Sequence, residues 1–273
     1  MIFEFKKYLF KHLKSLKIEK DDHIVIYCKL SSFGITNKKL AKLLSDSIIE
    51  YIGKKGTIIM PSYTFSDKNL TFDIKKVHAN RTTSPIIKEF FKNKNIKRSF
   101  RPIHSHIGIG SKSKFLLNNK NFNSFGKNTD FVQMKKHNFK SLFLGCSPNE
   151  AATFLLHLEY INNVPYRNKI TLKKKIKLKN KIKSVKIDYF DKPKNIIFDY
   201  DLAFKKLQKL GLKMNSANLR FGKSISFKIS DLNYYANILF NKDKYCLVKN
   251  IMTSSKKILD LIYQSVKKRP TSI

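Results

Sequence analysis

Residues 23–28 of the 273-residue chain, HIVIYC, form a short apolar run rich in β-branched side chains. Residues 56–61, GTIIMP, form a second run that a proline ends. Between the two runs, residues 40–52 place apolar side chains at helical spacing and stop before Gly53, a usual helix C-cap. Strand, helix and strand in this order predict a βαβ unit, in which the two strands are parallel and buried.

The alternation of strand and helix patterns continues along the chain. Up to Arg167 it predicts a helix over residues 84–91, a strand over residues 141–145 and a helix over residues 151–161. Beyond Arg167 it predicts strand-like residues 170–187, a helix over residues 201–210, a strand pair ending at residue 227 and a helix over residues 232–240. Residues 1–16 form an amphipathic helix that either packs on the core or lies on a membrane surface.

We therefore expect an α/β fold with a mixed, mostly parallel central sheet flanked by helices. A single domain over residues 1–273 fits the length of the chain. It has a core α/β part over residues 1–167 and an α+β C-terminal extension of the same domain over residues 168–273. The catalytic loops of such folds lie beyond the C-terminal ends of the strands.

The chain is strongly basic, with 56 Lys and Arg residues against 19 Asp and Glu residues and a formal net charge of +37. Only six of the basic residues are arginines, the side chains that read guanine and phosphate bidentately, so we expect no specific nucleic acid partner. The lysine-favouring codons of an AT-rich genome are one source of such a charge. A basic, non-enzymatic binder of nucleic acid or anionic membrane is an alternative function.

Cysteine usage and hydropathy bear on the location of the protein. Three cysteines lie far apart, at positions 28, 146 and 246, and no two form a Cys-x-x-Cys pair. This usage favours a reducing, cytoplasmic location and no metal site. No window of 18 apolar residues is present, so we expect no transmembrane segment. A homodimer is an open alternative to a monomer.

The fingerprints of several common cofactors are missing. The only Gly-x-Gly, residues 108–110, lacks the third glycine and the opening helix of a dinucleotide-binding loop. The sequence also has no Walker A, His-Glu-x-x-His or Gly-x-Ser-x-Gly motif. Dehydrogenase, NTPase, zinc protease and α/β-hydrolase functions are therefore disfavoured.

Polar side chains at three places are candidates for a site. Residues 29–34, KLSSFG, follow the first strand, where backbone N–H groups, two hydroxyls and a lysine suit a phosphate or a pantetheine arm; an ordinary turn is the alternative. Residues 98–106, RSFRPIHSH, gather arginines and histidines, as an exposed loop of a basic protein also does by chance. On the apolar helix over residues 153–159, His157 and Glu159 are either a base and its partner or core residues whose polar atoms are hydrogen-bonded inside the protein.

Five segments, in their order and spacing, make the chain similar to the aminoglycoside 3-N-acetyltransferase family. They are residues 24–34, the strand and loop over residues 56–65, Phe72-Asp73, residues 98–110 and, after Leu144-Gly145, residues 153–167. The resemblance covers most of the chain. It implies acetyl transfer from acetyl-CoA to an amino group, without a metal and without a covalent enzyme intermediate.

The resemblance also implies residues for each part of the reaction. His157 is the candidate general base and Glu159 its partner, with His104 on the thioester or acceptor side. The residues implied in acetyl-CoA binding are Lys29, Leu30, Ser31, Ser32, Phe33 and Ser105. Those implied in acceptor binding are Tyr63, Arg98, Thr153 and Arg167. Because members of the family also act in surface-glycan pathways and the positive field repels aminoglycosides, we expect an amino-sugar acceptor, including a nucleotide-linked one.

Two places depart from the family pattern. The family's Thr-x-x-His-x-x-Glu helix aligns on Thr153 and Glu159 and puts Leu156 at the histidine position. His157 is therefore displaced by one residue, or about 100° around a helix. The family's strand-end His-Ser-Ser is Tyr27-Cys28-Lys29 here. A family member that binds CoA or sugar without catalysis is a further alternative.

Overall fold

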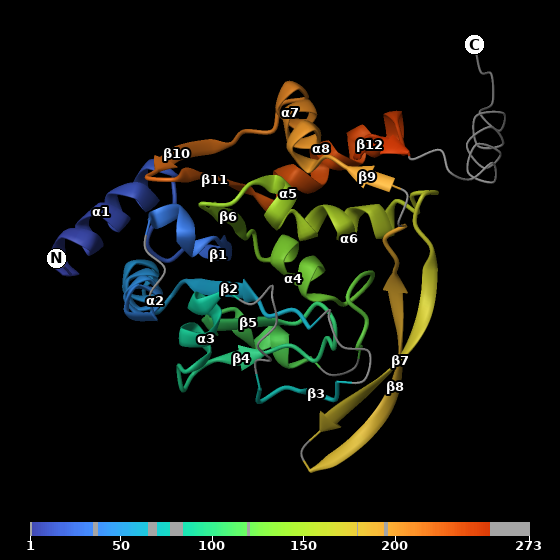
Figure 1. Ribbon diagram of the computed structural model, residues 1–273, viewed down its shortest axis with the longest axis horizontal. Helices are drawn as coiled ribbons and strands as arrows, with labels where there is room; N and C mark the ends of the chain where they lie inside the picture. Colours follow the sequence, from blue (N-terminus) through green and yellow to red (C-terminus); the bar gives the residue numbers. More distant parts are fainter. Residues whose placement is uncertain are drawn as a thin grey trace.

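The computed structural model of the protein describes residues 2–34, 38–64, 70–76, 84–118, 121–178, 180–193 and 196–251, called the described residues below. Within them, a seven-stranded mixed sheet has the strand order β10-β11-β6-β1-β2-β5-β4 (Figure 1). β1 is parallel to β2 and β6, and the other neighbours pair antiparallel. The strands are β1 (His23–Cys28), β2 (Thr57–Pro61), β4 (Lys97–Arg98), β5 (His106–Gly110), β6 (Lys140–Leu144), β10 (Asn215–Leu219) and β11 (Gly222–Lys228).

Helices cover both faces of this sheet (Figure 1). They are α1 (Ile2–Ser15), α2 (Lys38–Ile52), α3 (Pro85–Phe91), α4 (Asp130–Lys136), α5 (Pro148–Ala151), α6 (Thr153–Ile161), α7 (Tyr200–Lys209) and α8 (Ile229–Lys242). The 3₁₀ helices η1 (Leu30–Phe33) and η2 (Ser113–Leu117) follow β1 and β5. None of the helices in the described part of the chain combines the length and apolar character needed to cross a membrane.

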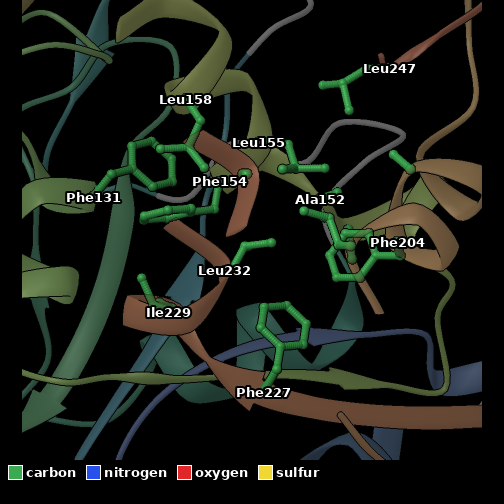
Figure 2. Packing of buried hydrophobic residues seen from close by; sticks show 14 of the residues in the cluster. Phe131, Ala152, Phe154, Leu155, Leu158, Phe204, Phe227, Ile229, Leu232 and Leu247 are labelled. Atoms are coloured by element: carbon green, nitrogen blue, oxygen red, sulfur yellow. The ribbon is translucent and has the colours of Figure 1, made fainter. Parts of the chain in front are cut away.

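The alternation of side chains along the strands divides the apolar core into two layers. Along β1, Ile24 and Ile26 belong to one layer, while Val25 and Tyr27 belong to the other. The first layer packs against α1, α2 and α3, so the amphipathic N-terminal helix is part of the core. The second layer packs against α4, α6, α7 and α8, and Figure 2 shows side chains of these helices meeting there.

A long hairpin extends from one side of the molecule (Figure 1). It consists of β7 (Lys169–Leu178) and β8 (Lys181–Phe190), and β3 (Phe72–Asp73) pairs parallel with β7. Ile176 and Ile187 are buried on it, while most of its lysines are exposed. Nearby in the sequence, β9 (Ile196–Phe198) pairs antiparallel with β12 (Val248–Ile251).

The α/β fold class with a mixed central sheet is confirmed. Within this sheet, parallel pairing is confined to β6, β1 and β2, and the four pairs outside them are antiparallel. Short direct connections, as between β10 and β11, favour antiparallel neighbours. β10 and β11, which come from the predicted C-terminal extension, continue the same sheet beyond β6. The helix expected over residues 151–161 is interrupted at Ala152, which separates α5 from α6.

Strand β5 is the main element that the sequence pattern does not predict. Its residues, HIGIG, include glycines that weaken a strand pattern. Gly108 is required by close packing, since a Cβ there would lie 2.3 Å from the Cδ1 atom of Ile59 on β2. The alternative of an exposed loop over residues 98–106 is wrong, because these residues are buried except for half-buried Phe100.

Candidate active site

A cleft of about 720 Å³ opens at the C-terminal ends of β1 and β2. The turn after β1, the N-terminal ends of α3 and α6, and α5 surround it. Its polar lining includes Tyr27, Lys29, Ser31, Tyr63, Glu150 and Thr153. Loops beyond the C-terminal ends of parallel strands form the ligand crevice of an open α/β sheet, so this cleft is the candidate active site.

A larger cleft, of about 830 Å³, lies at the opposite end of the same strands. Lys20 and Asp21, which precede β1, and Gly56, which precedes β2, line it together with Ile109 and Gly110 of β5. Because it lies at the N-terminal ends of β1 and β2, the topology of the sheet does not favour it as the catalytic crevice.

Three hydroxyl groups meet in the first cleft. The side chains of Tyr63 and Thr153 are hydrogen-bond partners of the Tyr27 hydroxyl. Burial raises the pKa of Tyr27 to about 12 and raises the pKa of Tyr63 well above its ordinary value. Both phenols are therefore neutral at physiological pH. A neutral phenol donates one hydrogen bond and accepts others, so each can contact a developing oxyanion or an amine.

Behind Tyr63, His106, the first residue of β5, connects the cleft to the buried carboxylate of Asp130. The Tyr63 hydroxyl lies 3.4 Å from His106 Nε2, and His106 Nδ1 lies 2.9 Å from Asp130 Oδ2. Arg101 Nε lies 3.7 Å from the other carboxylate oxygen, Asp130 Oδ1. His106, Asp130 and Arg101 are each at most 2% exposed, so water screens the interaction of Asp130 with Arg101 only weakly.

An ion pair marks the rim of the cleft. Lys29 Nζ lies 2.6 Å from Glu150 Oε1, and Glu150 also accepts the backbone N–H of Ser147 in the capping box of α5. These contacts attach α5 to the turn after β1. Both side chains of the pair are exposed, so it contributes little to stability, and Lys29 is accessible to anions from solvent.

The turn after β1 contributes only part of its predicted residues to the cleft. Lys29, Leu30 and Ser31 line the cleft, whereas Ser32 and Phe33 are buried away from it. Ser32 Oγ donates a hydrogen bond to the Gly145 carbonyl at 2.5 Å. Gly145 has a left-handed φ of 76°, and a Cβ there would lie 2.6 Å from Ser32 Cβ, so this glycine lets the turn pack closely on the end of β6.

His157 and Glu159, the predicted base and partner, lie in different surroundings. His157 is 2% exposed and stacks on Phe131 with a centroid distance of 5.2 Å, while burial lowers its pKa to about 3. Glu159 instead accepts a hydrogen bond from the Tyr166 hydroxyl at 2.9 Å. Neither side chain lines the cleft. Residues two positions apart on a regular helix do not face each other, which explains the separation.

Arg167, a predicted acceptor ligand, holds Glu159. Its Nε lies 3.1 Å from Glu159 Oε2, both side chains are at most 3% exposed, and its other end donates a hydrogen bond to the Tyr200 hydroxyl. The guanidinium also lies 4.4 Å from the ring centroid of Phe198. These contacts join the end of α6 to α7 and β9, away from the cleft.

The predicted residues before β5 stabilise their own loop. Arg98 donates hydrogen bonds to the backbone carbonyls of Asp73 and Ser62 and to Ser105 Oγ. His104 packs between Tyr63 and Phe125, and burial lowers its pKa to about 3. Arg98, His104 and Ser105 do not line the cleft.

The structure thus brings together Lys29, Leu30, Ser31, Tyr63 and Thr153 among the predicted site residues. It adds Tyr27, His106 and Asp130, to which the sequence analysis assigns no role. His106 lies in the stretch 98–106, but no local pattern connects it with Asp130, which is 24 residues further along the chain. Among the described residues, no group of three or more His, Cys, Asp or Glu side chains is placed to hold a metal ion.

Comparison with known families identifies the chain. The sequence model of the aminoglycoside 3-N-acetyltransferase family matches residues 25–237, and the chain belongs to this family. No curated protein sequence matches it.

Several solved structures share the fold. The YokD protein from Bacillus subtilis is 18% identical with a TM-score of 0.73, over 87% of this chain and 99% of that chain. AAC-IIIb in a binary complex with CoASH is 16% identical with a TM-score of 0.73, over 92% and 98% of the two chains. A variant of aminoglycoside acetyltransferase AAC(3)-IVa in complex with a gentamicin is 17% identical with a TM-score of 0.72, over 89% and 90%.

Proposed function

We propose that this member of the aminoglycoside 3-N-acetyltransferase family transfers an acetyl group from acetyl-CoA to the amino group of an amino sugar. Family membership over residues 25–237 is the observation that carries the proposal. The cleft at the ends of β1 and β2 provides the site. One similar structure holds CoASH and another holds a gentamicin, which supports a coenzyme and an amine-bearing acceptor as the two ligands here.

In this proposal the coenzyme binds along the turn after β1. Lys29 and Ser31 line the cleft and are exposed, and Leu30 adds an apolar contact between them. Coenzyme A carries phosphate groups, which an exposed lysine and the net charge of +37 attract. The acetyl thioester then reaches the hydroxyl groups of Tyr27, Tyr63 and Thr153 deeper in the cleft.

The acceptor is an amino sugar that carries negative charge. A net charge of +37 repels a polycationic aminoglycoside and attracts a phosphorylated or nucleotide-linked sugar, as used in surface-glycan assembly. Tyr63 and Thr153 supply the hydroxyl groups that orient it. A nearly neutral or anionic acceptor also reaches the cleft without displacing the coenzyme phosphates from Lys29.

The reaction needs a proton acceptor and a donor for the oxyanion. The ammonium group of the acceptor loses a proton before its nitrogen attacks the thioester, and the tetrahedral oxyanion then accepts hydrogen bonds. The Tyr27 hydroxyl is placed to donate one, because its raised pKa keeps it protonated. His157 as general base, assisted by Glu159, stays a prediction from the family resemblance.

Thiol release tests the proposal directly. The purified chain is incubated with acetyl-CoA and glucosamine, glucosamine 6-phosphate, a UDP-linked amino sugar or gentamicin, and free CoA thiol is measured. We expect release with an anionic amino sugar and weaker release with gentamicin. CoA binding is measured in parallel by calorimetry, and binding without thiol release on any acceptor would show a family member that has lost catalysis.

A cleft-filling variant provides the control. Ser31→Trp places a large ring in the cleft from an exposed position and is expected to abolish both CoA binding and thiol release. Ser184→Trp makes the same change at an exposed position on β8, outside the cleft, and is expected to keep both. Equal activity of the two variants would contradict this cleft as the site.

A further inference from the structure

We propose that Tyr63, His106 and Asp130 form the proton-accepting relay of the transfer reaction, with the Tyr63 hydroxyl in contact with the acceptor amine. This inference rests on the proposed acetyltransferase function and names the groups that move the proton. Tyr63 is the catalytic residue of the relay, because it lines the cleft. His106 and Asp130 act through it as positioning residues.

The order of the three groups sets the direction of proton movement. Asp130 Oδ2 lies 2.9 Å from His106 Nδ1, so Nδ1 carries the hydrogen and donates it to the carboxylate. Nε2 then presents its lone pair to the Tyr63 hydroxyl, 3.4 Å away. Catalytic hydrogen bonds are often long without substrate and shorten when it binds. In the proposed relay the Tyr63 hydroxyl donates to Nε2, and the acceptor amine meets the phenol oxygen on the cleft side, where Tyr27 and Thr153 also bond to it.

The fold holds this order rigidly. β2 pairs antiparallel with β5 in a register that sets Pro61 opposite His106. Tyr63 follows two residues after Pro61, and this places its side chain beside the His106 imidazole. Asp130 is the first residue of α4, and its second oxygen lies 3.7 Å from Arg101 Nε. The Asp130 carboxylate is thus held between the guanidinium and the imidazole.

The proton balance of the transfer closes within the relay. The acceptor ammonium group first loses one proton to solvent. The neutral amine nitrogen then forms a bond to the acetyl carbon, the bond from that carbon to sulfur breaks, and CoA leaves as a thiolate. The proton lost by the amine passes to the Tyr63 oxygen while the Tyr63 proton passes to His106 Nε2. The imidazolium returns it through Tyr63 to the thiolate, which leaves as the free thiol. Because burial raises the pKa of Tyr63, the phenol transmits the proton without existing as a stable phenolate.

The surroundings of His106 distinguish it from the other buried histidines near the cleft. Asp130 on α4 and Tyr63 after β2 contact it, and His104 before β5 interacts with it electrostatically. Arg101 lies on the far side of the carboxylate, against Asp130 Oδ1. Asp130 is the only one of these described groups whose charge stabilises an imidazolium. Replacement of Asp130 by asparagine therefore removes the carboxylate that both the imidazole and the Arg101 guanidinium contact.

Steady-state kinetics with acetyl-CoA and the best acceptor of the panel test the relay. We expect Tyr63→Phe to lower kcat by about 10²- to 10⁴-fold with little change in KM for acetyl-CoA, the usual contribution of a positioned acid or base. The matched control is Tyr51→Phe. It removes a half-buried hydroxyl that donates a hydrogen bond to the Ile18 carbonyl, on the face of the sheet that α2 covers. This variant should keep the wild-type kcat.

The positioning residue is tested by the separation of kcat from KM and by rescue. Asp130→Asn should lower kcat with little change in KM for acetyl-CoA, because His106 Nδ1 loses the carboxylate that orients the ring. Asp130→Glu, which keeps a carboxylate, should recover part of kcat, whereas a residue with a structural role alone would change kcat and KM together. Thermal unfolding checks that Asp130→Asn is folded. If Asp130→Asn does not fold, the kinetics of Tyr63→Phe, which keeps the aromatic ring, decide the test.

The competing base is His157. If His157→Phe abolishes turnover while Tyr63→Phe keeps the wild-type kcat, the relay is overturned and the proposed acetyl transfer stands with a different base. If the wild-type chain releases no thiol with any acceptor, the proposed function and the relay both fail. The activity of the wild-type protein thus distinguishes failure of the relay alone from failure of the proposed acetyl transfer.

Discussion

Two buried histidines lie on either side of Phe131 and differ in what else they contact. The Phe131 ring stacks on His157 at a centroid distance of 5.2 Å and meets His106 edge-on at 5.1 Å. His106 also contacts the Asp130 carboxylate and the Tyr63 hydroxyl at the cleft. His157 has Phe125 and Phe154 as its further ring neighbours.

The difference shows that burial and a carboxylate nearby in the sequence do not by themselves give a histidine a charged partner. Burial removes water from an imidazole and disfavours its charged form, and for His157 this lowers the pKa to about 3. Its sequence neighbour Glu159 pairs with Arg167 instead. Asp130, distant in the sequence, contacts His106 directly, and Tyr63 links that histidine to the cleft. Three variants break or sharpen this contrast.

The largest expected effect concerns the carboxylate on α6. Glu159→Gln leaves the Arg167 guanidinium buried without its charge partner, and such a loss lowers the free energy of unfolding by about 3–5 kcal/mol. Urea denaturation at pH 7 measures it. The control is Glu150→Gln, which removes the carboxylate of the exposed pair with Lys29 and should change the midpoint far less. Equal losses would mean that the buried pair has no special structural role.

A smaller effect concerns the acid sensitivity of His157. Burial lowers its pKa in the folded protein from 6.5 to about 3, so the unfolded chain takes up the proton first and stability falls as the pH drops below 6.5. His157→Phe removes this contribution. The loss of unfolding free energy between pH 7 and pH 5 should be smaller in the variant by about 2 kcal/mol.

Urea denaturation at both pH values measures the difference. His104, whose pKa burial also lowers to about 3, continues to contribute in wild type and variant alike, so some acid sensitivity remains in both. A variant that loses as much stability as the wild-type protein would place His157 in contact with water in the folded state.

The smallest expected effect lies at the rim, where solvent screens charges. Lys29→Ala should weaken CoA binding several-fold at low salt, because the exposed ammonium group attracts the coenzyme phosphates, and the difference should shrink as salt is added. Calorimetric titration with CoA measures it without an acceptor. Lys42→Ala on α2, which removes an exposed lysine paired with Asp46 outside the cleft, should leave the affinity unchanged. Equal CoA affinities of the two variants would contradict a role of Lys29 in coenzyme binding.

Much of the fold was predictable because its elements have strong local patterns. The apolar run of β1, the helix that ends at Gly53 and the alternating residues of β7 and β8 each carry their own period. β5 was not predictable in this way. Gly108 accommodates Ile59 on β2 and Gly110 accommodates the backbone of Gly56, and a strand pattern does not reveal which neighbour a glycine must accommodate.

The candidate site was predictable only where it follows a strand end. Lys29, Leu30 and Ser31 come directly after β1, so their position at the cleft follows from the topology of an α/β sheet. Arg98, Ser105 and Arg167 look like ligands from their polarity, but carbonyls, hydroxyls and a carboxylate of the protein itself occupy their hydrogen-bonding groups. A buried polar side chain is bonded somewhere, and the sequence does not name the partner.

The sequence by itself determined the α/β class, the order of the main helices and strands, the family and the positive charge, since these depend on local periodicity, motif order and composition. Only the tertiary structure decided which histidine has a route to the cleft. Tyr63 and His106 are 43 residues apart, and His106 and Asp130 are 24 apart. Their contact depends on the pairing of β2 with β5 and on the place of α4 beside them, and no local period records which elements become neighbours.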